Sequence, residues 1–104
     1  MKLDHIALRV KDIKTSVSWY KSALSATVNY QDDTWAMLKI KNCTIALISE
    51  EINHPPHISF SVNHVHEIPC DENSIKKHRD NSLYYYQSDP DGNIIEWIYW
   101  PKTY

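Results

Sequence analysis

The stretch SDPDGNIIEW, residues 88–97, contains the only glycine of the chain, Gly92, in a turn that leads into an apolar segment. Proline fixes its own φ and glycine takes the positive φ that other residues avoid, so residues 89–93 are typical of a tight turn. The following residues, 94–99, are isoleucine-rich and aromatic and predict a β-strand. Glu96 lies in the middle of that strand. Because an unpaired buried carboxylate is costly, we expect a positively charged partner for Glu96.

Outward from this stretch, the chain has the pattern of a mixed α and β protein. Apolar residues alternate with others in residues 3–10 and 57–62, which predicts strands with one apolar face. Asp12 offers an N-cap, and apolar residues then recur at helical spacing, so residues 13–24 are expected to form an amphipathic helix. Further strands are expected at 26–30, 35–40, 43–48, 83–87 and 93–99, with a short one at 74–78.

The two halves of the chain repeat the same order of elements. Each half is expected to have a strand, a helix and three more strands, and the polar segment 49–56 connects the halves. In the second half, residues 63–68 suffice for only a turn or two of helix. We therefore expect a single α+β domain of two βαβββ modules, at about 1–50 and 54–104, with the second helix much shortened.

Composition narrows the function classes. With 104 residues, 42% of them hydrophobic and 23% charged, the chain suits one globular domain. A net charge of −2 without a run of lysine or arginine argues against nucleic-acid binding. The sequence has no apolar run typical of a membrane span or a signal peptide, and its two cysteines lack CxxC spacing. We expect a cytoplasmic protein with reduced thiols.

Three residues form the candidate site. His5 and His57 occupy matching places at the start of the two halves, and Glu96 lies in the last strand. Two neutral imidazoles and one carboxylate suit a divalent metal and leave coordination positions open for water or substrate. Each histidine alone is equally compatible with a structural role, so the hypothesis depends on the three positions together.

The segments LDHIALRVKDIKTSVSWYKSAL, HISFSV and SDPDGNIIEW resemble three signatures of the vicinal oxygen chelate superfamily. This superfamily includes glyoxalase I, fosfomycin-resistance enzymes, extradiol dioxygenases and bleomycin-resistance proteins. The resemblance implies paired βαβββ modules whose sheets curl around a cavity. It also implies that His5, His57 and Glu96 bind Zn²⁺, Ni²⁺, Mn²⁺, Co²⁺ or Fe²⁺, and that Glu96 also moves a proton.

The resemblance extends to other positions. A fourth ligand position falls at Ala46, and alanine cannot bind metal, which argues against glyoxalase I activity itself. Arg9 is similar to an arginine that holds a substrate carboxylate, with a role as a surface residue as the alternative. Tyr84 and Tyr86 share one strand face and are candidates for contact with substrate, although tyrosines in sheets more often serve packing.

Two functions remain open from the sequence. The first is a metal-dependent enzyme, a lyase, isomerase or transferase that acts on a small oxygen-bearing substrate. The alternative is a metal-free module that binds a drug or metabolite, as bleomycin-resistance proteins do, in which Trp35, Tyr84 and Tyr86 carry the binding. Because the second module is trimmed, we also expect a homodimer.

Overall fold

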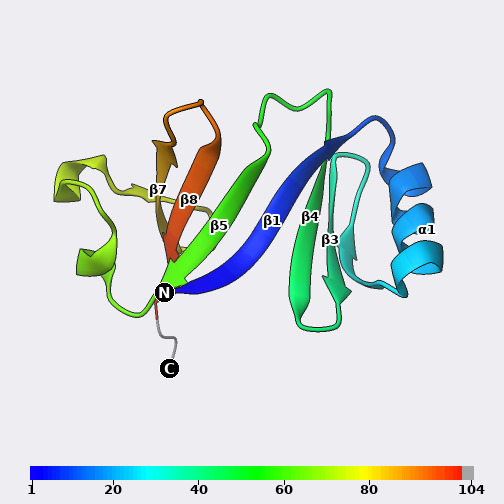
Figure 1. Ribbon diagram of the computed structural model, residues 1–104, viewed down its shortest axis with the longest axis horizontal. Helices are drawn as coiled ribbons and strands as arrows, with labels where there is room; N and C mark the ends of the chain where they lie inside the picture. Colours follow the sequence, from blue (N-terminus) through cyan, green and yellow to red (C-terminus); the bar gives the residue numbers. More distant parts are fainter. Residues whose placement is uncertain (102–104) are drawn as a thin grey trace. The chain divides into compact units, whose positions relative to one another are not determined.

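The fold is α+β, as predicted, with eight strands and one α-helix in the described part of the chain. The computed structural model describes residues 1–101 (Figure 1). The elements in chain order are β1 (Lys2–Val10), α1 (Ile13–Leu24), β2 (Thr27–Gln31), β3 (Trp35–Ile40), β4 (Cys43–Ser49), β5 (His57–Val62), two 3₁₀ turns (Val65–Glu67 and Glu72–Ser74), β6 (Lys76–Lys77), β7 (Leu83–Ser88) and β8 (Ile94–Tyr99). No helix among residues 1–101 is long and apolar enough to cross a membrane.

The strands belong to one mixed sheet in the order β2-β3-β4-β1-β5-β8-β7-β6. β1 and β4 are parallel, and α1 with two strands forms the long connection that parallel strands need. The hairpins β2–β3, β3–β4 and β7–β8 are antiparallel. By contacts, the chain divides into two compact units. Unit 1 comprises residues 1–4 and the chain from Ile58 onward, and unit 2 comprises His5–His57.

In unit 2, α1 covers one face of the sheet. The helix starts at its predicted N-cap, where a carboxylate oxygen of Asp12 accepts a hydrogen bond from the Thr15 N–H at 2.9 Å. Ser25 ends the helix in the left-handed conformation, with φ of 54°. The apolar stripe of the helix, Ile13 and Val17, packs on the core of unit 2, whose buried members also include Ala26, Ala36, Leu38 and Leu47.

The other face of unit 2 carries a second, smaller apolar cluster. Ala7 and Ala46 are direct neighbours on β1 and β4, and Ile48 follows on β4. The half-buried side chains of Trp35 and Met37 on β3 pack against them. His5 precedes Ala7 by two residues and therefore lies on this same face of β1.

Unit 1 contains no α-helix in its described residues. The segment between β5 and β6 forms two single 3₁₀ turns, which agrees with the predicted shortening of the second helix. The strand expected at 74–78 is shorter than predicted, because only Lys76–Lys77 pairs with β7. β7 and β8 pair along their whole length, with Tyr86 directly opposite Glu96.

Candidate metal centre

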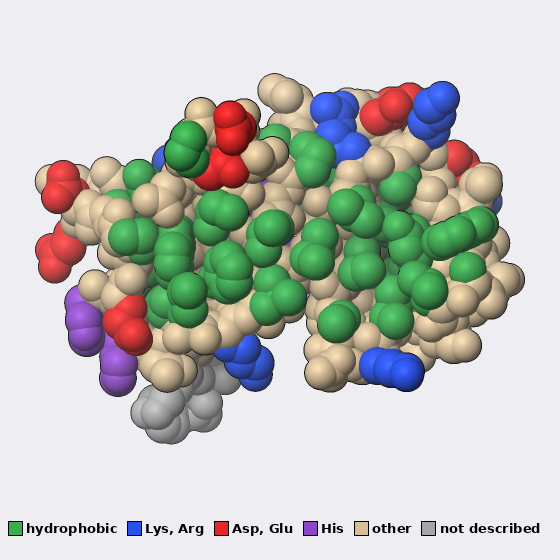
Figure 2. All heavy atoms as spheres, in the orientation of Figure 1, with side chains coloured by type: hydrophobic (Ala, Val, Ile, Leu, Met, Phe, Trp, Pro, Cys, Tyr) green, Lys and Arg blue, Asp and Glu red, His purple; other side chains and the backbone are tan. Residues whose placement is uncertain are grey.

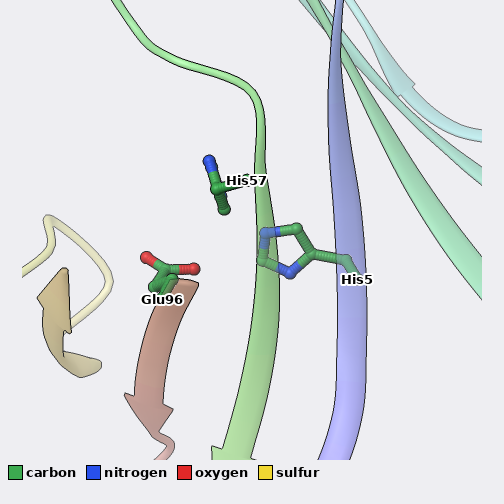
Figure 3. Close-up of side chains that lie close together, drawn as sticks. All are labelled: His5, His57 and Glu96. Atoms are coloured by element: carbon green, nitrogen blue, oxygen red, sulfur yellow. The ribbon is translucent and has the colours of Figure 1, made fainter. Parts of the chain in front are cut away.

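His5, His57 and Glu96 form a group of side chains that could hold a metal ion. One ligand atom from each of the three side chains lies within 4.8 Å of those of the other two (Figure 3). The imidazole rings of His5 and His57 meet edge to face, with their centroids 5.4 Å apart. His57 is 6% exposed and Glu96 is 2% exposed, whereas His5 is half-buried. This set of two imidazoles and one carboxylate could hold a divalent cation.

A contact to the backbone determines which nitrogen of His57 is available. Nδ1 of His57 lies 3.1 Å from the carbonyl oxygen of Pro55. A carbonyl only accepts, so Nδ1 carries the hydrogen and Nε2 presents its lone pair. Metal-binding histidines characteristically donate their second ring nitrogen in this way. The two prolines that end the connector, Pro55 and Pro56, thus place an acceptor where the ring needs one.

The turn that precedes β8 has the conformation expected from its sequence. Gly92 has a φ of +86°, and its N–H donates to the Asp89 carbonyl at 3.1 Å. The Asp89 side chain accepts hydrogen bonds from the N–H groups of Asp91 and Asn93 at 2.9 and 2.8 Å. This turn fixes the register of β8 and so selects the face on which Glu96 lies.

Two side chains of unit 1 hold the Glu96 carboxylate. Nε2 of His78 lies 3.0 Å from its Oε2 atom. On β7, Tyr86 is hydrogen-bonded to the same carboxylate, and burial, the charge of Glu96, the neighbouring Tyr84 and this hydrogen bond raise the pKa of Tyr86 well above its ordinary value. Hydrogen-bond donors therefore compensate part of the cost of burying Glu96.

Sequence reasoning missed His78. The residue lies in an irregular segment just after β6, with no periodicity and no matching position in the first half of the chain. Its backbone N–H donates to the Ser82 carbonyl at 2.9 Å, and its ring stacks on Tyr84 with centroids 3.7 Å apart. No pattern in the sequence indicates this contact, because a long-range side-chain contact from a loop leaves no local signal.

The residues predicted to contact substrate, Arg9, Trp35, Tyr84 and Tyr86, differ in their exposure and in the side chains around them. Arg9 is exposed, and its Nη2 donates to the Glu50 carbonyl at 2.6 Å. Trp35 stacks on Tyr30, with centroids 4.5 Å apart, and packs in the small apolar cluster of unit 2. Tyr84 lies on the same face of β7 as Tyr86, so both tyrosines share a face with Glu96.

A cavity of about 400 Å³ lies on the other face of unit 1. Its lining includes Val65, Ile68 and Cys70 from the segment with the 3₁₀ turns, together with Leu83 of β7. Leu83 alternates with Tyr84, so the cavity is on the face opposite Glu96. Burial raises the pKa of the Cys70 thiol, which is then a poor nucleophile.

Comparison with known proteins shows the class to which the chain belongs. A family model described as "Glyoxalase/Bleomycin resistance protein/Dioxygenase superfamily" matches residues 2–77. The chain therefore belongs to this superfamily, as the sequence resemblance predicted. No curated protein matches the chain.

Solved structures share the fold at low sequence identity. Methylmalonyl-CoA epimerase from Mycobacterium tuberculosis has a TM-score of 0.75 at 16% identity, with 97% of this chain and 89% of that chain covered. A glyoxalase/bleomycin resistance protein/dioxygenase superfamily member from Vibrio splendidus 12B01 has a TM-score of 0.69 at 16% identity, with 94% of this chain and 99% of that chain covered. A variant of Streptomyces coelicolor methylmalonyl-CoA epimerase, in complex with 2-nitronate-propionyl-CoA, has a TM-score of 0.70 at 16% identity, covering 98% and 99%.

Proposed function

We propose that this protein binds one divalent metal ion through His5, His57 and Glu96 and acts as an enzyme on a small oxygen-bearing substrate. The observation that carries the proposal is the proximity of three donor atoms of suitable type, within 4.8 Å of one another. A second observation supports the proposal. The Pro55 carbonyl accepts a hydrogen bond from Nδ1 of His57, which leaves the lone pair of Nε2 available for the ion.

Three protein ligands leave positions for substrate. When bound, the ion supplies Lewis-acid chemistry, which polarises substrate oxygens and stabilises the negative charge that develops on them. Ala46 provides no fourth donor, so more of the coordination sphere is open to substrate than with four protein ligands.

In the proposed reaction Glu96 also accepts and returns a proton. Its carboxylate is the buried acidic group of the site, and Tyr86 and His78 hold it in place. Arg9 supplies a cation that binds an anionic group of the substrate, using the guanidinium donors other than the one on Glu50. Tyr84 and Trp35 provide apolar contact area for the rest of the substrate.

Among the reaction classes open to the fold, we favour isomerisation by proton transfer next to a carbonyl. Ring cleavage requires O₂ and a redox-active metal, and thiol transfer requires a second substrate, whereas isomerisation requires only a Lewis acid and a carboxylate. The similarity to structures named as methylmalonyl-CoA epimerases agrees with this choice at the level of fold.

The experiment is metal uptake by the purified chain. We expect dialysis against each of the five ions, followed by elemental analysis, to give one tightly bound ion per chain for at least one of them. His57→Ala and Glu96→Ala should lower that uptake to background, while His66→Ala, which changes an exposed histidine, should leave it unchanged. A wild-type chain that binds none of the ions, or a His57→Ala variant that binds normally, would contradict the proposal.

The reaction is tested separately from the ion. The metal-loaded protein in D₂O should exchange the α-hydrogen of a small acyl thioester or 2-oxo acid, as followed by proton NMR. Chelation should stop the exchange, and Glu96→Gln should lower its rate by at least about 100-fold because a general base typically contributes that much. Exchange by the fully chelated protein at an undiminished rate would argue against a role for the metal.

A metal-free binding module is the second candidate, and one observation favours it. Trp35 and Met37 present a half-buried apolar surface beside Ala7 and Ala46 in unit 2. By the sequence resemblance, Ala46 stands where other members carry a fourth ligand. In such a module, a small aromatic ligand would quench the fluorescence of Trp35 equally with and without chelator. If the ligand binds only when the metal is present, the result supports the metal-dependent enzyme and not the metal-free module.

We also propose a homodimer. Phe60, Tyr85 and Trp97 lie on the sheet face of unit 1 opposite Glu96, and no α-helix of the described residues of that unit covers this face. Figure 2 shows hydrophobic side chains gathered over the strands of this unit, at the left. Sedimentation equilibrium should give the mass of two chains, and the mass of one chain would contradict the proposal.

A further inference from the structure

We propose that His78 is a positioning residue of the metal centre, which holds the Glu96 carboxylate in its ligating orientation through a hydrogen bond from Nε2. This inference rests on the proposed function, because it assigns His78 a role toward the same ion. His78 itself is outside the group of side chains whose ligand atoms lie within mutual reach. Its role is therefore to act through Glu96.

The contact has a defined direction. Nε2 of His78 and Oε2 of Glu96 are 3.0 Å apart. A carboxylate that binds a metal ion is ionised and only accepts, so in the proposed site Nε2–H of His78 is the donor. The other carboxylate oxygen, Oε1, is fully buried. A hydrogen bond to a charged acceptor in such a site is stronger than one between neutral groups.

The rest of unit 1 holds His78 in position. Its ring is nearly parallel to that of Tyr84, at 12°, with the centroids 3.7 Å apart. Its backbone N–H donates to the Ser82 carbonyl, and the N–H of Asn81 donates to the His78 carbonyl at 3.0 Å. Asp80 accepts from both the N–H and the hydroxyl of Ser82, which is fully buried. The donor is thus preorganised by a closed turn and a ring stack.

Two donors from unit 1 restrict the rotation of the carboxylate. Tyr86 is its direct cross-strand neighbour, and His78 reaches it from the loop after β6. Without these donors the Glu96 side chain could adopt several rotamers. Metal binding would then have to select one rotamer, and the loss of conformational entropy would weaken the binding. Outer partners of metal ligands typically contribute about 10- to 100-fold in metal affinity.

The test compares Co²⁺ binding by the wild type and by His78→Phe, with His66→Phe as the matched control. Phenylalanine keeps an aromatic ring to stack on Tyr84 but has no donor. The exposed His66 likewise stacks on a ring, that of the exposed His64. The dissociation constant is measured by competition with a chelator, and the visible absorption spectrum of bound Co²⁺ reports its coordination. Circular dichroism and thermal unfolding monitor the fold of each variant.

We expect His78→Phe to weaken Co²⁺ binding by about 10- to 100-fold and to alter the Co²⁺ spectrum. His78→Gln, whose amide can donate to the carboxylate, should recover part of the affinity, and His66→Phe should behave as the wild type. If His78→Phe does not fold, His78→Ala takes its place in the comparison with His78→Gln.

Equal affinity and an unchanged spectrum in His78→Phe would overturn the positioning role while the proposed metal site stands. A His78→Gln variant no better than His78→Phe would overturn the hydrogen bond as its cause. A wild-type chain that binds no Co²⁺ or any other of the five ions would instead overturn the proposed function and this inference with it. The two failures are therefore distinguishable.

Discussion

The imidazole of His78 meets the carboxylate of Glu96 at 3.0 Å, although 18 residues separate them in the chain. Glu96 is almost fully buried in a strand that is otherwise apolar, and a carboxylate in such a position needs donors. His78 and Tyr86 provide them from within the same compact unit. These two contacts within unit 1 offset part of the cost of burying the carboxylate.

Removing the second donor should destabilise the protein. Tyr86→Phe takes a hydrogen bond from a buried carboxylate, so we expect the free energy of unfolding to fall by about 1–2 kcal/mol. Tyr85→Phe is the matched control, because Tyr85 lies on the opposite face of the same strand, and its effect should be below about 0.5 kcal/mol. Urea denaturation measures both, and equal effects would contradict this role of Tyr86.

The turn before β8 offers a test of backbone conformation. Gly92 has a φ of +86°, and a Cβ atom placed there would have no heavy atom within 4 Å outside its immediate chain neighbours. Gly92→Ala should therefore cost about 1 kcal/mol in unfolding free energy, from backbone strain alone. Gly92→Asn should cost less, because asparagine tolerates a left-handed conformation. A Gly92→Ala variant as stable as the wild type would show that the turn does not require this conformation.

The same turn should contribute to acid sensitivity. Hydrogen bonds from the side chain and backbone of Asn93 hold the pKa of Asp89 below its ordinary value of 3.8. A lowered pKa in the folded state means that the ionised form stabilises the fold, so this contribution is complete above about pH 4 and is lost as the pH falls through the folded-state pKa.

Urea denaturation at a series of pH values from 7 to 2 measures this contribution. The free energy of unfolding of Asp89→Asn should therefore fall less steeply below pH 4 than that of the wild type. Asp91→Asn, which removes the same charge from the same turn, should keep the wild-type slope. Identical slopes for Asp89→Asn and the wild type would contradict the assignment.

Ala46 allows a test by adding a ligand. Ala46 is 6% exposed and pairs with Ala7, two residues from His5. Ala46→Glu buries a carboxylate, so we expect the metal-free variant to lose roughly 3 kcal/mol or more of stability. A divalent ion should restore much of that loss, because the new carboxylate would lie beside the proposed centre.

Ile48→Glu is the control for this variant. Ile48 is 8% exposed and lies on the same face of β4, one alternation further along the strand. The same ion should not restore its stability. Equal recovery of both variants, or of neither, in thermal unfolding with and without metal would argue against a centre near Ala46.

Local sequence signals were sufficient for most of the fold. The Asp12 cap and the helical spacing of Ile13 and Val17 predicted α1, because capping and amphipathic spacing are properties of adjacent residues. Alternation predicted β1 and β5 for the same reason. The predicted length of β6, residues 74–78, was too great. Only Lys76–Lys77 pairs with β7, and the length of this strand is determined by that pairing and not by its own residues.

The candidate site was only partly predictable. The resemblance to known signatures singled out His5, His57 and Glu96, a group that could hold a metal ion. The contact from His78 depends on a turn closed by Ser82 and on a ring stack with Tyr84, and neither has a signature in the sequence. Arg9 was expected to face a substrate, and its contact with the Glu50 carbonyl became visible only in three dimensions.

The most direct test of the metal centre is a crystal structure of the protein grown with Zn²⁺ or Co²⁺, with anomalous data collected at the absorption edge of the metal. The account predicts one anomalous peak per chain, about 2.0–2.2 Å from a nitrogen of His5, Nε2 of His57 and a carboxylate oxygen of Glu96. The account would be contradicted if the anomalous peak lay elsewhere and the donor atoms of His5, His57 and Glu96 were too far apart to bind one ion.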